Sequence, residues 1–136
     1  MLETAAKKSA PEEKKTIKVY LVQHGNVVSK EINPERPLSD KGRKDVEKIA
    51  GLLKKIKLNV NVIQHSEELR ATQTAEILHS TIKSIRDIVQ KNNLAPNDPI
   101  EPLWYEIMKA HEDLLIVGHL PFLSRLASRL LSGKAD

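Results

Sequence analysis

Short, almost continuously apolar runs alternate along the chain with longer stretches in which apolar residues recur every three or four positions. The continuous runs are rich in β-branched residues and predict buried strands at 17–22, 58–63 and 114–117. A spacing of three and four is typical of amphipathic helices that bury one face. It predicts helices over 40–55, 66–89, 102–108 and 121–130, with Ser39 as the N-cap of the first.

Strands that alternate with helices favour an α/β fold. We expect a three-layer α/β/α arrangement, in which an open, mainly parallel sheet carries helices on both faces. The length of 136 residues, 40% of them apolar, suits one such domain and is too short for two. Residues 1–15 are rich in Lys, Glu and Ala and lack apolar periodicity, so they predict a disordered tail ahead of a single domain over 16–136.

Charge and composition exclude several classes of function. The chain carries 22 Lys and Arg against 18 Asp and Glu, and the net charge of +4 steers anions only weakly. Because aromatic residues make up 3% of the chain and no basic stripe runs between stacking rings, we expect no nucleic-acid partner. The lack of cysteine excludes disulfides, zinc–thiolate sites, iron–sulfur clusters and a cysteine nucleophile.

Location and cofactors are also constrained by the sequence. No apolar run approaches the roughly 18 residues needed to cross a bilayer, and the N-terminus lacks the basic-then-apolar order of a signal peptide. We therefore expect a cytoplasmic protein without a membrane partner. No pair of histidines and carboxylates has the spacing of a metal site, so we expect neither a metal nor a cofactor.

Residues that suit phosphate chemistry follow all three predicted strands. In an open α/β sheet the ligand binds beyond the carboxyl ends of the strands. His24 follows the first strand, Arg70 lies one helical turn beyond the second, and His119 follows the third. A single histidine at a strand end is more often a capped or partly buried side chain, but agreement among three strand ends favours a shared site. A neutral imidazole that attacks phosphorus fits this set, with donors on the other oxygens and backbone N–H groups from a helix beginning at Ser66.

Four segments of the chain have a recognisable order and spacing. They are Leu21-Val22-Gln23-His24-Gly25, Arg36-Pro37-Leu38-Ser39-Asp40-Lys41-Gly42, Ser66-Glu67-Glu68-Leu69-Arg70-Ala71-Thr72-Gln73-Thr74-Ala75 and Val117-Gly118-His119-Leu120-Pro121-Phe122-Leu123. Over nearly all of 18–131, the chain resembles the histidine phosphatase superfamily, and specifically its small SixA-type phosphohistidine phosphatases.

The resemblance implies a metal-free phosphatase that passes through a phosphohistidine intermediate. His24 occupies the position of the family's nucleophile. Arg70 matches a phosphate-binding arginine, and His119 matches the second histidine, which holds the phosphoryl group and stabilises the transition state. Arg36 matches an arginine near the pocket, on the side of the substrate beyond the phosphate. Small members lack the usual glutamate, and Asp98 is the candidate general acid.

Gln23 stands where the family motif Arg-His-Gly has its arginine. A glutamine amide offers phosphate neutral donors only, without the charge and bidentate geometry of a guanidinium. Because a charge-assisted hydrogen bond is worth roughly 1.5–3 kcal/mol, we expect phosphate handling to be about ten- to a hundred-fold weaker. Asn26, where many relatives carry an acid, and Glu67, which replaces a common proline, also disfavour a phosphate dianion.

The leading hypothesis is a SixA-like phosphatase that hydrolyses a phosphoryl group on a phosphoprotein in signal transduction. Short connections leave no room for lid insertions, which favours a protein substrate. The alternatives are a catalytically impaired pseudo-phosphatase that binds phosphate or a phosphorylated partner, and a general small-molecule phosphomonoesterase.

The resemblance also bears on assembly and on the remaining histidines. Relatives continue into a further strand where this chain ends at Asp136, so we expect a domain short at its C-terminal edge. An uncovered sheet edge would invite pairing with a second chain and allow an oligomer. His65, His79 and His111 match no ligand position of the family and are expected to be structural or solvent-facing.

Overall fold

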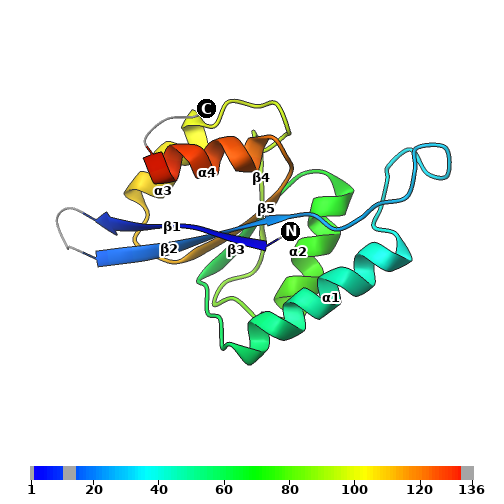
Figure 1. Ribbon diagram of the computed structural model, residues 1–136, viewed down its shortest axis with the longest axis horizontal. Helices are drawn as coiled ribbons and strands as arrows, with labels where there is room; N and C mark the ends of the chain where they lie inside the picture. The colour runs from blue at the N-terminus through cyan, green and yellow to red at the C-terminus, as the bar shows by residue number, and fades with distance from the viewer. Residues whose placement is uncertain (1, 11–14, 133–136) are drawn as a thin grey trace.

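The sheet consists of five strands, four of them parallel (Figure 1). The computed structural model describes residues 2–10 and 15–132. Across the sheet the order is β1-β2-β5-β3-β4, and β1 pairs antiparallel with β2 at one edge. The strands are β1 (Leu2–Ala10), β2 (Lys15–Gln23), β3 (Val62–Ser66), β4 (Val89–Lys91) and β5 (Leu114–Gly118).

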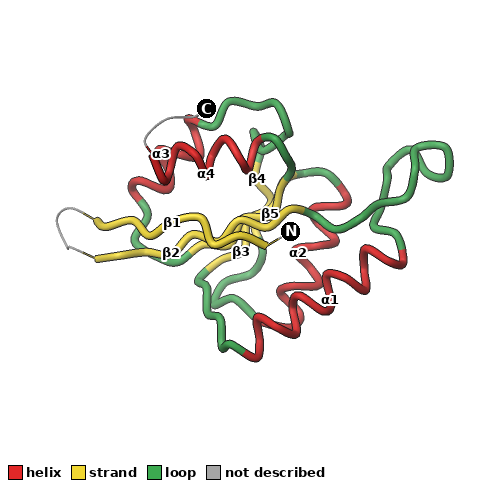
Figure 2. Tube along the Cα trace, in the orientation of Figure 1, coloured by secondary structure: helices red, strands yellow, loops and turns green. Residues whose placement is uncertain are grey.

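Helices cover both faces of the sheet (Figures 1 and 2). On one face lie α1 (Asp40–Lys55) and α2 (Leu69–Ile82), and on the other lie α3 (Glu101–Lys109) and α4 (Phe122–Ser132). The central strand β5 is buried along its whole length. Its residues alternate between the two cores: Leu115 and Val117 pack under α1 and α2, whereas Leu114 and Ile116 pack under α3 and α4. The three-layer, mainly parallel α/β arrangement expected from the sequence is therefore confirmed.

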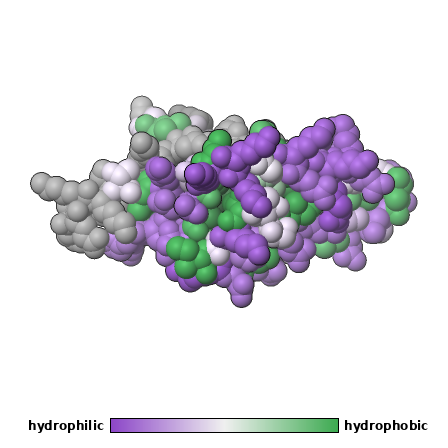
Figure 3. All heavy atoms as spheres, turned by 90° about the horizontal axis from the view of Figure 1, so that it is seen from below, coloured by the Kyte–Doolittle hydropathy of each residue, from purple (hydrophilic) through white to green (hydrophobic). Residues whose placement is uncertain are grey.

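Helix α1 begins as the sequence predicts. The Ser39 side chain accepts a hydrogen bond from the Gly42 backbone N–H at 3.0 Å, which satisfies one of the donors of the first turn. Gly42 lies against the loop after β2, where a Cβ atom would be 2.0 Å from the carbonyl oxygen of Asn26. Seen from the side of α1 and α2, the surface is largely hydrophilic, with hydrophobic residues between the hydrophilic ones (Figure 3). None of the described helices is long and apolar enough to cross a membrane.

Two elements have different bounds from those predicted. The strand expected at 58–63 lies at Val62–Ser66, because the pairing with β5 includes the polar residues Gln64 and His65, which interrupt the apolar pattern. The helix expected over 66–89 is α2, which ends at Ile82.

The segment after α2 corrects the prediction of a long helix. Lys83 follows α2 in the left-handed region, with φ 53°. Ile85, which continues the apolar spacing, is 79% exposed, so that spacing does not mark a buried helical face. Val89–Lys91 then form the short edge strand β4, which pairs with β3 and has no counterpart in the sequence prediction.

The N-terminal residues correct the expectation of a disordered tail. Leu2–Ala10 form β1, in antiparallel register with β2 from Leu2 opposite Val22 to Ala10 opposite Lys15. Hydrogen bonds between strand backbones require no apolar periodicity, which explains why composition gave no sign of this strand. Residues 1 and 11–14 of the predicted tail, and 133–136 at the other end, lie outside the described residues.

Candidate active site

Three neighbouring strand ends bring His24, His119 and Arg70 together. The backbone N–H of His24 donates to the carbonyl oxygen of Gly118 at 3.1 Å, which places the residues after β2 and β5 side by side. The rings of His24 and His119 meet edge to face, with centroids 5.0 Å apart. Arg70, in the first turn of α2, donates from Nε to Nε2 of His24 at 3.3 Å. The structure thus brings together the three residues that the sequence predicts to converge.

His24 is held as a neutral imidazole with one defined unprotonated nitrogen. Nδ1 lies 2.7 Å from the carbonyl oxygen of Gly25, which can only accept, so Nδ1 carries the proton. Burial lowers the pKa of His24 below 6.5, and the charges of Arg70 and Arg36 lower it further, against the Gly25 hydrogen bond, which raises it. Nε2 therefore keeps a lone pair at neutral pH, as an attacking imidazole requires.

His119 is almost completely buried, with 2% of its surface exposed. Burial lowers its pKa to about 4, with further contributions from Arg70 and His24, so the ring is neutral at pH 7. Nε2 lies 2.6 Å from Oγ of Ser66, the last residue of β3. Nδ1 is buried and has no hydrogen-bond partner among the described residues.

The guanidinium of Arg70 is shared between His24 and a carboxylate. Nη1 of Arg70 lies 3.4 Å from Oε1 of Glu68, whose side chain is 52% exposed against 17% for Arg70. A bound anion would therefore compete with Glu68 for the charge of Arg70. Glu68 is also the N-cap residue of α2, so the helix starts three residues later than the predicted start at Ser66.

Gln23 and Arg36 flank this group less directly. Gln23 ends β2 and is half-buried, and its side chain has no hydrogen-bond partner in the part of the chain that the structure describes. Arg36 donates from Nε to the carbonyl oxygen of Val28 at 3.2 Å, and its charge contributes to the lowered pKa of His24. The site thus has positive charge from Arg70 and Arg36, and a neutral amide at the end of β2.

Asp98, the candidate general acid, lies in the turn before α3. Its Oδ2 accepts from the backbone N–H of Ala95 at 2.9 Å, and its carbonyl oxygen accepts from Arg125 at 3.2 Å. Within residues 2–10 and 15–132, no hydrogen bond or ion pair joins Asp98 to His24, His119 or Arg70.

Two hydroxyl groups connect the site: that of Thr74, which the sequence analysis did not single out, and that of Ser66, which it named only for backbone N–H groups. Thr74 is fully buried, and its Oγ1 accepts from the backbone N–H of Gly25 at 3.1 Å while donating to the carbonyl oxygen of Arg70 at 2.8 Å. It therefore ties the segment that carries His24 to the helix that carries Arg70. Ser66 likewise ties the end of β3 to His119, which follows β5. The available signal for Thr74 was a polar residue on the apolar face of α2, one turn after Arg70.

The remaining histidines differ from this group. His65 is 3% exposed and bonds through Nδ1 to the carbonyl oxygen of Ser66 at 2.9 Å, which confirms the expected structural role. His79 lies 3.1 Å from Oγ of Ser84 and 3.9 Å from a carboxylate oxygen of Asp87. Ser84 donates its proton to the carbonyl oxygen of Arg86, so this Ser-His-Asp group joins the end of α2 to the next turn and offers no nucleophile.

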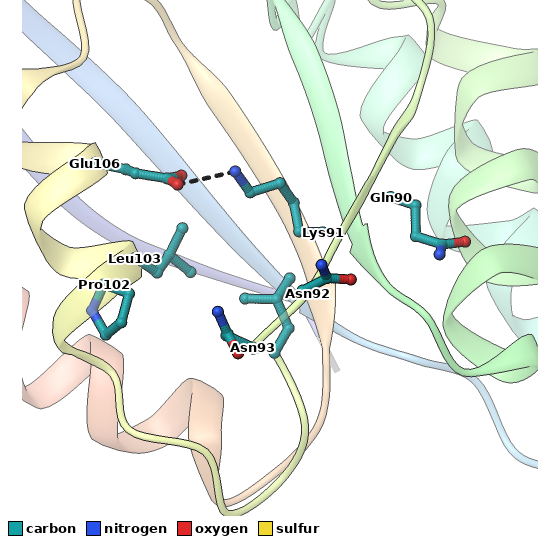
Figure 4. Close-up of a pocket in the computed structure, with 8 residues that line it drawn as sticks. Gln90, Lys91, Asn92, Asn93, Pro102, Leu103 and Glu106 are labelled. Carbon is teal, nitrogen blue, oxygen red and sulfur yellow. Dashed lines mark hydrogen bonds and ion pairs between the residues drawn. The ribbon is translucent and has the colours of Figure 1, made fainter.

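A pocket of about 310 Å³ lies between β4 and α3 (Figure 4). Lys91 and Glu106 form an ion pair across it at 2.9 Å. Lys91 is paired in register with Ser66, so the pocket begins one strand away from the residue that contacts His119. It is lined by Gln90, Lys91, Asn92, Asn93, Leu94, Pro102, Leu103 and Glu106. In the described ranges, no group of three His, Cys, Asp or Glu residues has the arrangement of a metal site.

Known proteins share both the sequence pattern and the fold. The histidine phosphatase superfamily (branch 1) matches residues 19–95 of the chain. The protein histidine phosphatase SixA, solved in complex with tungstate, superposes with a TM-score of 0.77 at 22% identity, over 85% of this chain and 78% of that one. No curated protein matches the sequence.

Other members of the fold act on different phosphate compounds. Phosphoglycerate mutase from Plasmodium falciparum has a TM-score of 0.64 at 22% identity, over 82% of this chain and 66% of that one. The mycobacterial glucosyl-3-phosphoglycerate phosphatase has a TM-score of 0.62 at 16% identity, over 82% of this chain and 77% of that one. Because the superfamily match includes His24 and Arg70 and the fold is shared throughout, the chain belongs to the histidine phosphatase superfamily.

Proposed function

We propose that the protein is a phosphohistidine phosphatase that removes the phosphoryl group from a histidine of another protein. The observation that carries the proposal is the neutral imidazole of His24, with its proton held on Nδ1 by Gly25 and its Nε2 in contact with Arg70. This nitrogen combines nucleophilic character with an adjacent positive charge, which phosphoryl transfer requires.

The reaction proceeds in two displacements. Nε2 of His24 attacks phosphorus in line, a bond forms between Nε2 and phosphorus, and the bond from phosphorus to the substrate nitrogen breaks. The substrate nitrogen takes a proton as it leaves. Water then attacks phosphorus, the bond to Nε2 breaks, and inorganic phosphate leaves with His24 restored. Arg70 and Arg36 stabilise the charge on the equatorial oxygens, and His119 donates a hydrogen bond to them.

The comparison with SixA also supports an oxyanion at this site. The related SixA protein was solved with tungstate, an oxyanion of phosphate-like shape.

We propose Asp98 as the donor of the proton to the leaving group. Asp98→Asn is then expected to slow substrates with basic leaving groups more than it slows p-nitrophenyl phosphate, whose leaving group needs no proton. Equal slowing of both substrates would contradict this role.

A second candidate is a binding module that holds a phosphorylated partner without turnover. It is favoured by the neutral amide of Gln23 and by Glu68, which occupies part of the Arg70 guanidinium. Both features lower the positive charge available to a phosphoryl group in its transition state.

Trapping of the covalent intermediate separates the two. The full chain is incubated with a phosphohistidine protein or with phosphoramidate, without added metal and with a chelator, and the protein is assayed for acid-labile, base-stable phosphate. We expect label that appears and decays in the wild type and in His111→Ala, a histidine outside the site, but not in His24→Ala. Binding of the phosphoprotein with neither label nor phosphate release would favour the binding module.

A further inference from the structure

Ser66 and His119 form the shortest side-chain contact of the site. Oγ of Ser66 lies 2.6 Å from Nε2 of His119, and the two residues are 1% and 2% exposed. The contact joins the ends of β3 and β5, and β5 lies between β3 and β2, the strand that His24 follows. Nothing in the proposed chemistry yet uses Ser66.

The direction of this hydrogen bond follows from the other contact of Ser66. The backbone N–H of Glu68 donates to Oγ of Ser66 at 3.4 Å, so the oxygen already acts as an acceptor. A buried hydroxyl proton requires an acceptor of its own, and Nε2 of His119 is the one within reach among the described residues.

We propose that Ser66 is a positioning residue that donates to Nε2 of His119 and thereby fixes the neutral ring with its proton on Nδ1. A neutral imidazole has one N–H group, and a donor at Nε2 leaves Nδ1 as the protonated nitrogen. Burial, with the charges of Arg70 and His24, lowers the pKa of His119 to about 4, so the ring is neutral at pH 7 and has one N–H group to place.

This arrangement leaves an unused hydrogen-bond donor, Nδ1 of His119, next to the nucleophile His24. Nδ1 of His119 is buried without a partner among the described residues, and a buried N–H without an acceptor is costly, so it gains from an acceptor that enters the site. The ring of His24 lies edge to face at 5.0 Å. If the proposed function holds, on which this step rests, an oxygen of the phosphoryl group on His24 is that acceptor.

Nitrogen NMR on the uniformly ¹⁵N-labelled full chain tests the proton position without any need for activity. In the wild type at pH 7, Nδ1 of His119 should give the signal of a protonated nitrogen and Nε2 that of an unprotonated one. Addition of inorganic phosphate should shift Nδ1 more than Nε2. The opposite assignment in the wild type would overturn the proposal.

Three variants show whether Ser66 sets this state. Ser66→Ala should lose the single tautomer, and Ser66→Thr, which keeps the hydroxyl, should retain it. Ser84→Ala is the matched control, because it removes a similarly buried serine that contacts a different histidine, His79. It should alter the signals of His79 and leave those of His119 unchanged. An unchanged His119 tautomer in folded Ser66→Ala would also overturn the proposal, and if that variant does not fold, the wild-type assignment decides alone.

Kinetics provide the second readout where turnover is found. Ser66→Ala should lower kcat about threefold to tenfold with little change in KM, as expected for loss of one neutral hydrogen bond that orients a transition-state donor. Ser66→Thr should restore most of the rate. A raised KM with unchanged kcat would contradict the role. The two proposals fail separately, since the tautomer is observed even if no phosphate is trapped on His24.

Discussion

Position 23 allows one substitution to test the electrostatics of the whole site. Gln23 ends β2, lies opposite Gly118 in the sheet and directly precedes the proposed nucleophile. Its half-buried side chain has no hydrogen-bond partner in the described part of the chain, so the substitution Gln23→Arg removes no side-chain hydrogen bond there. It adds a guanidinium beside His24, where Arg70 already contacts Nε2 at 3.3 Å.

The expected gain follows from the difference between charged and neutral donors. A charge-assisted hydrogen bond contributes about 1.5–3 kcal/mol and a neutral one about 0.5–1.5 kcal/mol. Bidentate geometry adds to this difference, whereas repulsion from Arg70 and Arg36 reduces it. We therefore expect Gln23→Arg to bind an oxyanion tighter by about 1–2 kcal/mol, or about fivefold to thirtyfold in dissociation constant.

Calorimetric titration with orthovanadate measures this gain without a substrate. Gln90→Arg is the matched control, since Gln90 is exposed on β4, three strands from β2, and receives the same added charge. Turnover of phosphoramidate by the same proteins then distinguishes the two candidate functions. A large rise from a silent background would favour a binding module, and little change in an active protein would show a site adapted to glutamine.

Two results would refute the reasoning. Equal vanadate affinity of folded Gln23→Arg and the wild type would show that position 23 does not face the anion. Equal gains in Gln23→Arg and Gln90→Arg would show that the added charge acts through the general field of the protein rather than through a contact.

Three further predictions concern the site and its support. Glu68→Gln should tighten vanadate binding up to about fivefold because it releases the guanidinium from a partly exposed ion pair, and Glu67→Gln, the adjacent control, should change it less. Gly42→Ala should destabilise the fold strongly in urea unfolding because its Cβ would lie 2.0 Å from a backbone oxygen, whereas Gly51→Ala, in open space on the same helix, should stabilise it by about 0.5–1 kcal/mol. The unfolded chain protonates His119 near pH 6.5 and the folded chain near pH 4, so the free energy of unfolding should fall as pH drops between these values, and less steeply in His119→Gln.

The sequence predicted the centre of the fold better than its edges. The run 114–117 and the spacing within 40–55 correspond to β5 and α1 almost residue for residue, because a fully buried strand and a capped amphipathic helix leave strong patterns. Edge strands leave weak sequence patterns. Val89, the first residue of β4, continues the apolar spacing of α2 by coincidence, and the left-handed residue Lys83 that ends the helix carries no signal such as glycine.

The site was predictable in its members but not in its contacts. The position of His24, Arg70 and His119 after strand ends sufficed to place them together, since parallel strands end at one edge of a sheet. Which nitrogen of each ring is unprotonated depends on contacts with Gly25 and Ser66. These contacts arise from tertiary geometry rather than from a periodic pattern. The pairing of Glu68 with Arg70 is likewise a matter of side-chain conformation at the start of α2.

The proposed nucleophile His24 and its partners follow strands that are far apart along the chain. At the other end of the β2–β5 pair, the backbone N–H of Lys18 donates to Asp113 across 95 positions, so the two strands close a very long loop. Pairing over such a separation is slow to form, because the entropy of loop closure must be lost before the contacts are gained. A partly folded chain that lacks this pairing therefore does not hold His24 next to His119. Any oxyanion that the folded site binds will in turn stabilise the folded chain, so vanadate should raise the melting temperature by an amount that grows with the logarithm of its concentration over its dissociation constant.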